Sequence, residues 1–275
     1  MNLSFEGVSF IYPSGVKALN QINLTIPEGT TVAIIGENGA GKTTLVKLLN
    51  GLLRPTTGKV MVGDWATNDR TTAELAAQVG FLFQNPNDQL FERNVEREVA
   101  YGPGNLKLSS RERTRRVKTA LQQAGLTTKA KKHPYDLSET ERKMVALAAT
   151  LAMETPVLVL DEPTIGQDAN GRARIGRILR ELNKNGRTIL LISHDLDFCA
   201  EHAERVIVMA DGQILADGLP KDVLAQTSTL KRAAVIAPQL VRLAQALKMP
   251  ATPLTVKEFA SEYSQWRRKK IHKKR

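Results

Sequence analysis

The residues that decide the fold are Gly36-Glu37-Asn38-Gly39-Ala40-Gly41-Lys42-Thr43. They fit the pattern G-x-x-x-x-G-K-[ST] of the phosphate-binding P-loop. The apolar run before them, Thr31 to Ile35, predicts a buried strand, and Thr44 to Leu49 predicts a helix that ends at Asn50-Gly51. A strand, a glycine loop and a helix together indicate a phosphate site, because backbone N–H groups and a positive helix end then point at the anion.

The loop offers a nucleotide both backbone and side-chain contacts. Its glycines let the backbone wrap closely around phosphates without Cβ clashes. Lys42 would reach the β and γ phosphates, and the Thr43 hydroxyl would hold Mg²⁺. We expect the nucleotide-binding residues of this region to be Gly36, Asn38, Gly39, Gly41, Lys42, Thr43 and Thr44.

Length and composition allow one large domain or two modest ones, since the chain has 275 residues. No apolar run approaches the ~20 residues of a membrane span, and the N-terminus lacks the layout of a signal peptide. Cys199 is the single cysteine, so we expect no intramolecular disulfide. The simplest compartment for such a chain is the cytoplasm.

The net charge of +11 suits a polyanionic partner or an anionic membrane surface. Much of the excess lies in the final run, Arg267 to Arg275. Such a run usually forms a solvated, mobile tail. Attraction to a membrane surface and nucleic-acid binding are the alternatives, and the second lacks an interleaved aromatic stacking platform.

Two kinds of strand are predicted around the loop. Leu3 to Phe10 and Ile22 to Ile26 alternate roughly between apolar and polar residues, so they predict an antiparallel sheet with one solvent-exposed face. Val157 to Leu160 is continuously apolar, which is typical of a central parallel strand. The segment from Gly186 to Ser193 is another buried strand, and His194 follows it.

Polar side chains follow the buried strands. Asp161 and Glu162 come directly after Leu160, beside the P-loop in the expected sheet. Asp161 would hold Mg²⁺ through water, and Glu162 would polarise the attacking water as general base. Gln84 follows the predicted strand from Val79 to Phe83, where it can reach Mg²⁺ and the same water. The alternative for Gln84 is an Asn/Pro turn without a ligand role.

Tyr12, the P-loop, Gln84 and Asp161-Glu162 occur in an order that resembles the ATPase subunits of ABC transporters. The stretch Phe83-Gln84-Asn85-Pro86-Asn87-Asp88-Gln89, continued by Glu98 to Pro103, looks like the energy-coupling factor (ECF) subgroup. That subgroup drives the uptake of vitamins and of cobalt or nickel ions. The resemblance covers about residues 1–250.

The resemblance implies further roles. Tyr12 would stack on the purine base, with ordinary packing as the alternative, and His194 would be the switch histidine that contacts the γ-phosphate. Asp168 matches the D-loop, which runs across a dimer interface. Residues 84–103 would form the groove that receives a coupling helix of a transmembrane subunit.

Leu137-Ser138-Glu139-Thr140-Glu141 stands where the family carries Leu-Ser-Gly-Gly-Gln. In the family, this helix start faces the γ-phosphate bound by the other subunit, and its glycines allow close approach. Here Ser138 and Glu141 predict a capping box. Glu139 adds a like charge, which costs about 1–4 kcal/mol at ~4–6 Å. We expect Ser138 to act in trans in a degenerate signature motif; the alternative is a capped helix without a nucleotide role.

Two amphipathic helices are predicted near the C-terminus. Their apolar residues repeat at i, i+3, i+4 and i+7: Leu240, Leu243, Ala244 and Leu247, and then Val256, Phe259, Ala260 and Tyr263. They either pack onto the parent domain or, as the resemblance implies and we favour, contribute to dimer contacts. We expect a nucleotide-binding domain over 1–220, with a helical part at about 86–153, and an extension with a basic tail over 221–275.

The predicted fold class is α/β: a P-loop, RecA-like core sheet with an antiparallel β subdomain, a helical insertion and a C-terminal helical extension. The predicted function is MgATP hydrolysis that energises an ECF-type importer of a vitamin or a transition-metal ion, at the cytoplasmic face of the cell membrane. The degenerate signature favours a heterodimer with a second ABC ATPase subunit. This pair would engage a transmembrane coupling subunit directly and a substrate-binding membrane subunit indirectly.

Two alternatives stay open. One is a vestigial subunit that binds ATP but barely hydrolyses it. The other is a soluble, non-transport ABC ATPase that acts on nucleic acid or the ribosome. We expect no nucleic-acid partner, because the long coiled-coil or zinc-bearing insertions and the second cassette of such proteins do not occur in the sequence.

Overall fold

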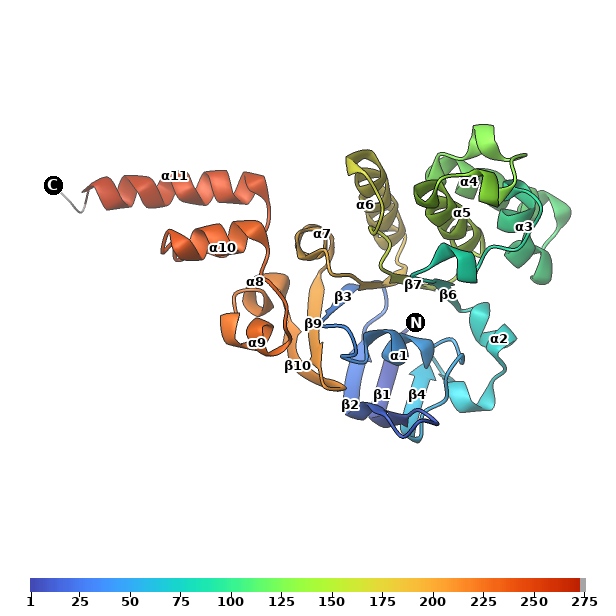
Figure 1. Ribbon diagram of the computed structural model, residues 1–275, viewed down its shortest axis with the longest axis horizontal. Coiled ribbons are helices and arrows are strands. Elements are labelled where there is room, and N and C mark those ends of the chain that lie inside the picture. Colours follow the sequence, from blue (N-terminus) through green and yellow to red (C-terminus); the bar gives the residue numbers. More distant parts are fainter. Residues whose placement is uncertain (273–275) are drawn as a thin grey trace.

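Two β-sheets form the body of the protein within residues 1–272, the part of the chain that this computed structural model describes. The larger sheet has six strands in the order β10-β9-β3-β8-β7-β6. The smaller sheet has four strands in the order β2-β1-β4-β5. Helices cover the larger sheet and extend from it at two ends (Figure 1).

The larger sheet is parallel except for its edge strand β10, which pairs antiparallel with β9. Its strands span Thr31–Ile35 (β3), Val79–Leu82 (β6), Val157–Asp161 (β7), Thr188–Ile192 (β8), Arg205–Ala210 (β9) and Gln213–Gly218 (β10). Successive residues of β7 enter different cores, one on each face: Leu158 and Leu160 in one, Val157 and Val159 in the other. Both faces are therefore buried, which explains why these strands are continuously apolar.

The smaller sheet is antiparallel, as the alternating N-terminal sequence predicts. Its strands span Leu3–Ile11 (β1), Lys17–Ile26 (β2), Thr57–Val62 (β4) and Trp65–Ala66 (β5). Its inward side chains, such as Leu3, Phe5 and Leu24, share a core with one face of the larger sheet. The predicted combination of a P-loop core sheet with an antiparallel subdomain is confirmed.

A helical insertion joins β6 to β7, and its helices lie together on one side of the molecule (Figure 1). They span Val95–Asn105 (α3), Ser110–Ala124 (α4) and Glu139–Ala152 (α5). Ser109 caps α4 at its start, and Gly125 ends it in the left-handed conformation. The remaining helices of the core are Lys42–Lys47 (α1), Thr72–Ala76 (α2), Ala169–Lys184 (α6) and Leu196–His202 (α7).

The C-terminal extension lies at the opposite end from the helical insertion (Figure 1). Its helices span Pro220–Val223 (α8), Thr227–Arg232 (α9), Gln239–Ala246 (α10) and Val256–His272 (α11). Helix α11 continues through residues 267–272, so this part of the basic run is helical; whether it is mobile stays a prediction. Residues 273–275 of that basic run lie outside the described residues. None of the helices within 1–272 is long and apolar enough to cross a membrane.

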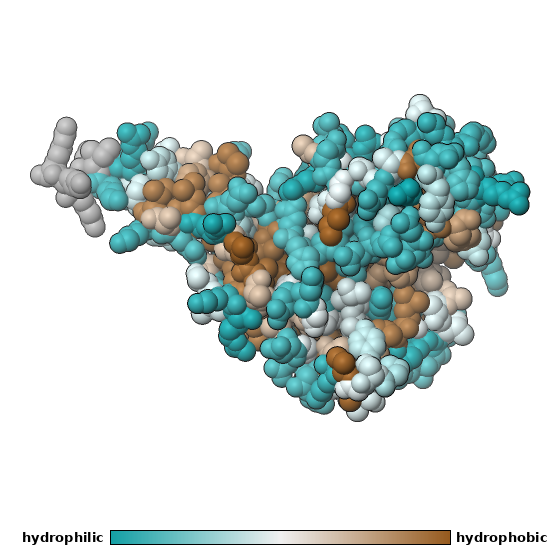
Figure 2. Space-filling view, in the orientation of Figure 1, coloured by the Kyte–Doolittle hydropathy of each residue, from teal (hydrophilic) through white to brown (hydrophobic). Residues whose placement is uncertain are grey.

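Apolar side chains remain exposed on this extension. Figure 2 shows hydrophobic surface gathered over α10 and α11. The exposed large hydrophobic residues of the segment include Ile236, Leu243 and Val256, and Val256 is 75% exposed. One face of α11 also carries Phe259, which stacks on Tyr263 with ring centroids 5.9 Å apart. Such a surface is typical of a contact with another chain.

Candidate nucleotide-binding site

A cavity of about 370 Å³ brings together most of the residues predicted to bind the nucleotide. It opens where the carboxyl ends of β3, β7 and β8 meet, because these strands run parallel and pair side by side. The predicted residues that line it are Tyr12, Asn38, Gly39, Gly41, Lys42, Thr43, Thr44, Gln84, Asp161, Glu162 and His194.

The P-loop wraps tightly around its own lysine. The Lys42 ammonium donates hydrogen bonds to the carbonyl oxygens of Gly36 and Glu37, each at 2.8 Å. Gly36 does not line the cavity but shapes the loop, since a Cβ there would lie 2.2 Å from the Met209 carbonyl oxygen. Burial lowers the pKa of Lys42, and the carboxylates of Glu162 and Asp161 oppose that shift. Phosphate oxygens would be stronger partners for this ammonium than carbonyl groups.

Thr43 and Asp161 form the part of the site that suits a cation. The Thr43 hydroxyl donates to Oδ2 of Asp161 at 2.9 Å. Burial raises the pKa of Asp161, while the hydrogen bond from Thr43 and the charges of Lys143 and Lys42 lower it. Hydroxyl and carboxylate oxygens are ligands that Mg²⁺ accepts, and Gln84 lines the same cavity.

A magnesium ion at this place would also need oxygens from the nucleotide. Within residues 1–272 no group of three or more His, Cys, Asp or Glu side chains could hold a metal by itself. Mg²⁺ in nucleotide sites commonly uses one or two carboxylates together with phosphate oxygens and waters. The donors present at Thr43, Asp161 and Gln84 fit that pattern.

Glu162 and His194 face each other at the wall of the cavity. The backbone N–H of His194 donates to Oε2 of Glu162 at 3.2 Å, and His194 Nε2 lies 3.3 Å from Oε1. Oε1 is buried and receives no hydrogen bond among the described residues. Burial raises the pKa of Glu162 to about 7. Such a carboxyl group can take up a proton near neutral pH, which a general base must do.

The imidazole of His194 is held between the two sides of the cavity. Its Nε2 lies 3.1 Å from Oδ1 of Asn38 in the P-loop. Burial and the nearby Lys42 charge both lower the pKa of His194, so the ring is neutral at pH 7. A neutral ring with one N–H can donate to a phosphate oxygen without carrying a charge itself.

Tyr12 stands at the rim of the cavity. Its hydroxyl shares a hydrogen bond of 2.9 Å with Thr44, and its ring meets Phe10 edge-on with centroids 4.8 Å apart. These contacts fix the ring beside the P-loop. Stacking on a base stays a prediction.

Ser138 and Asp168 do not line the cavity of their own chain. The predicted capping box is present: Oγ of Ser138 accepts from the Glu141 N–H at 3.3 Å, and Glu141 accepts from the Ser138 N–H at 3.0 Å. Lys129 also forms an ion pair with Glu141. Asp168 caps α6, where it accepts from the Gly171 N–H at 2.7 Å. Both side chains therefore serve their own helix ends.

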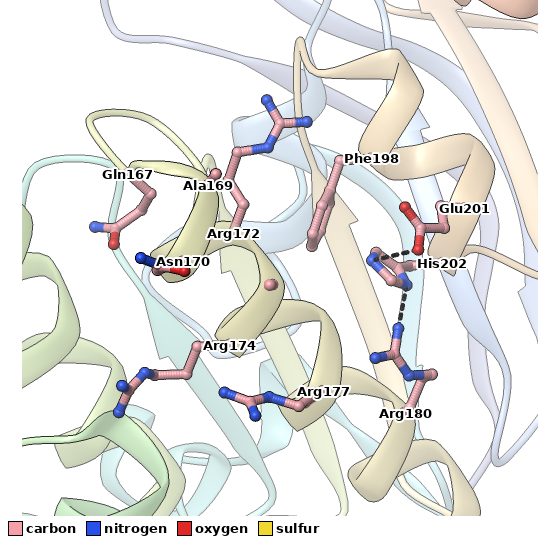
Figure 3. Close-up of a pocket in the computed structure, with 11 residues that line it drawn as sticks. Gln167, Ala169, Asn170, Arg172, Arg174, Arg177, Arg180, Phe198, Glu201 and His202 are labelled. Atoms are coloured by element: carbon pink, nitrogen blue, oxygen red, sulfur yellow. Dashed lines mark hydrogen bonds and ion pairs between the residues drawn. The ribbon is translucent and has the colours of Figure 1, made fainter. Parts of the chain in front are cut away.

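A larger cavity lies elsewhere, between α6 and α7, and measures about 930 Å³ (Figure 3). Four arginines of α6 line it, and two of them contact α7 or its cap. Arg172 pairs with Asp195 at 2.7 Å, and Arg180 lies 3.4 Å from Nδ1 of His202. This cavity holds no P-loop and no strand-end carboxylate, so the smaller cavity is the site with the chemistry for a nucleotide.

Sequence reasoning missed Lys143, which lies behind the site on α5. It is 3% exposed, and it donates to the carbonyl oxygens of Phe83 at 3.1 Å and of Gln84. Burial lowers the pKa of Lys143 to about 8, and the charges of Asp161 and Glu162 oppose that shift. A signal was available, because Lys143 shares a buried helical stripe with Leu147 and Leu151.

Comparison with known proteins agrees with the fold. A family model described as "ABC transporter" matches residues 19–165. The chain is 42% identical over 240 residues to the energy-coupling factor transporter ATP-binding protein EcfA of Methanocaldococcus jannaschii, covering 86% of each chain. It is also 42% identical to EcfA2 of Symbiobacterium thermophilum, covering 90% of this chain and 88% of that protein.

Two solved structures are similar as well. One is cbiO1 from Clostridium perfringens, described as part of the ABC transporter complex cbiONQ. It is 34% identical, with a TM-score of 0.74, and the match covers 90% of this chain and 98% of cbiO1. The other is the dimeric ATP-binding cassette MJ0796 bound to ADP and Pi. It is 29% identical, with a TM-score of 0.73, and the match covers 80% of this chain and 99% of MJ0796.

Proposed function

This chain belongs to the ABC transporter ATP-binding proteins of the energy-coupling factor type, and on that basis we propose how its site works and what it drives. It is the ATP-hydrolysing subunit of an importer that takes up a vitamin or a transition-metal ion. It lies at the cytoplasmic face of the membrane and is held there by membrane partners. The observation that carries the proposal is the meeting of Lys42, Thr43, Asp161, Glu162 and His194 in one cavity.

The chain's residues would divide the work of hydrolysis as follows. The P-loop N–H groups and Lys42 hold the β and γ phosphates. Thr43, Asp161 and Gln84 would hold Mg²⁺, and a bound magnesium ion would supply charge stabilisation for the phosphate oxygens. Oε1 of Glu162, which receives no hydrogen bond among the described residues, would orient the attacking water and accept its proton. The water oxygen would bond to the γ-phosphorus while the bond from that phosphorus to the β–γ bridging oxygen breaks and ADP leaves with the electron pair. Neutral His194 donates to a γ-phosphate oxygen.

A third cavity, of about 260 Å³, would receive the coupling helix of the transmembrane subunit. Most of its exposed lining is apolar, and it lies between α2, α3 and α5. Three large side chains on it are exposed: Leu52, Phe91 and Tyr101. Phe91 and Tyr101 contact each other edge-on with centroids 4.7 Å apart. An apolar groove rimmed by aromatic side chains suits the apolar face of a helix.

The signature helix favours a heterodimer. ATP would lie between two subunits, with the P-loop site of one covered by the start of α5 of the other. The start of α5 here is capped by its own side chains, and the exposed Glu139 adds a carboxylate where the phosphates would approach. A partner with glycines at these positions would cover this chain's site well. The partner's own P-loop would face the start of α5 of this chain, which suits a phosphate poorly.

The C-terminal extension would add to the contact between the two ATPase subunits. Its exposed residues Ile236, Leu243 and Val256 offer apolar area on the side of the molecule away from the coupling groove. Family membership also favours transport over the alternative of a soluble ABC ATPase that acts on nucleic acid or the ribosome.

A paired substitution tests which site drives transport. Glu162→Gln in this chain should stop turnover of the assembled transporter, while the equivalent change in the partner subunit should leave most of it. The opposite outcome would contradict the assignment. Fractionation of cells gives a separate check: recovery of the chain with nucleic acid, and never with a membrane subunit, would exclude the transport role.

A further inference from the structure

Helix α5 carries a buried lysine that the steps of hydrolysis above do not use. Lys143 is 3% exposed. Its ammonium donates to the carbonyl oxygens of Phe83 at 3.1 Å, of Gln84, and of Asp161 at 3.5 Å. A lysine has three N–H donors, so these acceptors match its full capacity. Burying a charged group is costly unless it is satisfied in this way.

The three carbonyl groups belong to two neighbouring strand ends. Strands β6 and β7 are parallel and pair directly, from Val79 with Val157 to Leu82 with Leu160. Gln84 follows β6 and opens the connection into the helical insertion, while Asp161 is the last residue of β7. Lys143 therefore fastens the root of the helical insertion to the strand that carries Asp161 and Glu162.

The first turn of the same helix is fastened to the loop before α6. The Thr140 hydroxyl donates to the Gly166 carbonyl oxygen at 2.7 Å, and the Gln167 side chain donates to the Thr140 carbonyl oxygen at 3.1 Å. Helix α5 thus contacts the loop before α6 with its first turn and both strand ends with its second. Displacement of this helix must shift these contacts together or break them, because packed elements are not continuously deformable.

We propose that Lys143 is a positioning residue for hydrolysis in this chain's own site. It holds Gln84 and Asp161 as one unit and makes that unit move with α5. Motion at the Ser138 end of the helix, which would face the partner's nucleotide, is thereby transmitted to Gln84 and Asp161 of this chain. The inference rests on the proposed assignment of Gln84 and Asp161 to the magnesium ion.

The test compares two substitutions on the same helix in the purified full chain, assembled with its partner subunit. Lys143→Met keeps the apolar stem but removes the charge and all three donors. Thr150→Val is the matched control, because Thr150 also bonds α5 to β6, at the Phe81 carbonyl oxygen (3.3 Å), but lies farther from the site. The readouts are kcat, the Mg²⁺ concentration for half-maximal rate, ATP affinity, and hydrogen exchange at the amides of Gln84 and Asn85.

Lys143→Met is expected to lower kcat about ten- to one-hundred-fold, as misplacement of reacting groups does. It should also raise the Mg²⁺ requirement and speed exchange at Gln84, with little change in ATP affinity. Lys143→Arg, which keeps charge and donors, should recover part of the rate, and Thr150→Val should lower only the melting temperature. If Lys143→Met does not fold, Lys143→Gln replaces it.

Equal losses of kcat in Lys143→Met and Thr150→Val would overturn the proposal, because they would show a merely structural role. So would an unchanged kcat and Mg²⁺ requirement in Lys143→Met. Glu162→Gln, measured in the same assay, separates this outcome from failure of the proposed function. A Glu162→Gln variant that hydrolyses ATP at the native rate would refute the assigned site, whatever Lys143→Met does.

Discussion

At the scale of single residues, Glu162 is unusual in both its backbone and its side chain. Its φ of 52° lies in the left-handed region, which costs a residue with a side chain about 1–3 kcal/mol. Its buried Oε1 accepts no hydrogen bond among the described residues. Strain and an unused acceptor beside the P-loop agree with a proton acceptor whose partner is the attacking water.

Glu162 sets the expected pH dependence of hydrolysis. Burial raises its pKa to about 7, and only the deprotonated form can accept a proton. We expect kcat/KM for ATP to rise between pH 6 and pH 8, and Glu162→Gln to lower kcat about 100-fold or more without abolishing ATP binding. A rate profile of the native chain that is flat or falls over this range would contradict the role of Glu162.

Two glycines of the P-loop offer a matched pair of substitutions. Gly39 and Gly41 both have positive φ, 85° and 97°. A Cβ at Gly39 meets nothing within 4 Å, whereas one at Gly41 would lie 2.5 Å from the Ala18 carbonyl oxygen. Gly39→Ala should therefore cost only the conformational term, about 1–2 kcal/mol, and Gly41→Ala clearly more. The melting temperatures of the two ligand-free variants check that Gly41→Ala is the more destabilising. An equal decrease in melting temperature in both variants would contradict this prediction.

The sequence predicts well where a candidate site residue lies when its position follows from local spacing, although the roles stay predictions. Lys42, Asp161, Glu162 and His194 lie next to strands whose apolar runs are easy to read. The helical stripe could indicate that Lys143 is buried, but not that its partners are Phe83 and Gln84, which are far away in sequence. Whether a charged side chain is buried and satisfied depends on such tertiary contacts.

At the scale of elements, the first two turns of helix α5 have different roles. Its start satisfies itself through the box between Ser138 and Glu141, with Lys129 as an added partner of Glu141. Its second turn, at Lys143, reaches the strand ends that carry this chain's own site. The capping box could be read from the sequence because it depends on residues three apart. The ion pair between Lys129 and Glu141 could not be read from the sequence in this way.

Helix α3 also holds a buried carboxyl group, that of Glu98, which predicts that stability depends on pH. Glu98 is 3% exposed, and its Oε2 accepts from the N–H groups of Phe91 (2.9 Å) and Glu92 (2.7 Å). Burial raises its pKa, and these hydrogen bonds counteract part of the shift. The folded protein then holds this proton more tightly than the unfolded chain, so Glu98 lowers stability as pH rises from its ordinary pKa to its raised one.

Glu98→Gln removes this titration but keeps an acceptor for both N–H groups. The melting temperature of Glu98→Gln minus that of the native protein should therefore be more positive at pH 8 than at pH 4. Glu181→Gln, on the exposed face of α6, is the control and should show no such difference. A difference in melting temperature between Glu98→Gln and the native protein that does not change with pH would contradict this prediction for Glu98.

At the scale of the whole molecule, three candidate functional surfaces are spread along the chain. The apolar cavity at Phe91 and Tyr101 lies between α2, α3 and α5. The exposed helices α10 and α11 lie at the opposite end of the molecule from the helical insertion (Figure 1). The nucleotide cavity lies between them in the core. The fold class followed from the order of motifs along the chain. Residues 267–272 could not be recognised as helical, because their composition alone matches a solvated tail.

The exposed residues of the extension predict an effect on association. Val256→Asp places a charge at a side chain that is 75% exposed, so the isolated subunit should keep its melting temperature. If this surface contacts the other ATPase subunit, the substitution should weaken association in sedimentation experiments about ten-fold or more. Lys257→Asp, at the neighbouring exposed residue, is the control. Equal association of native and Val256→Asp chains would exclude the contact at this residue.

We propose that this chain carries an intact nucleotide site, while the start of its helix α5 is poorly suited to cover the phosphates of another site. The most direct test is ATP turnover by the purified chain alone. Glu139→Gly with Glu141→Gln removes both carboxylates from the start of α5. We expect the native chain to turn over slowly and the double variant at least about ten-fold faster, since relieving a like charge is worth about 1–4 kcal/mol. Adding Glu162→Gln should abolish the gain. A native chain that alone hydrolyses ATP as fast as the double variant would contradict this account.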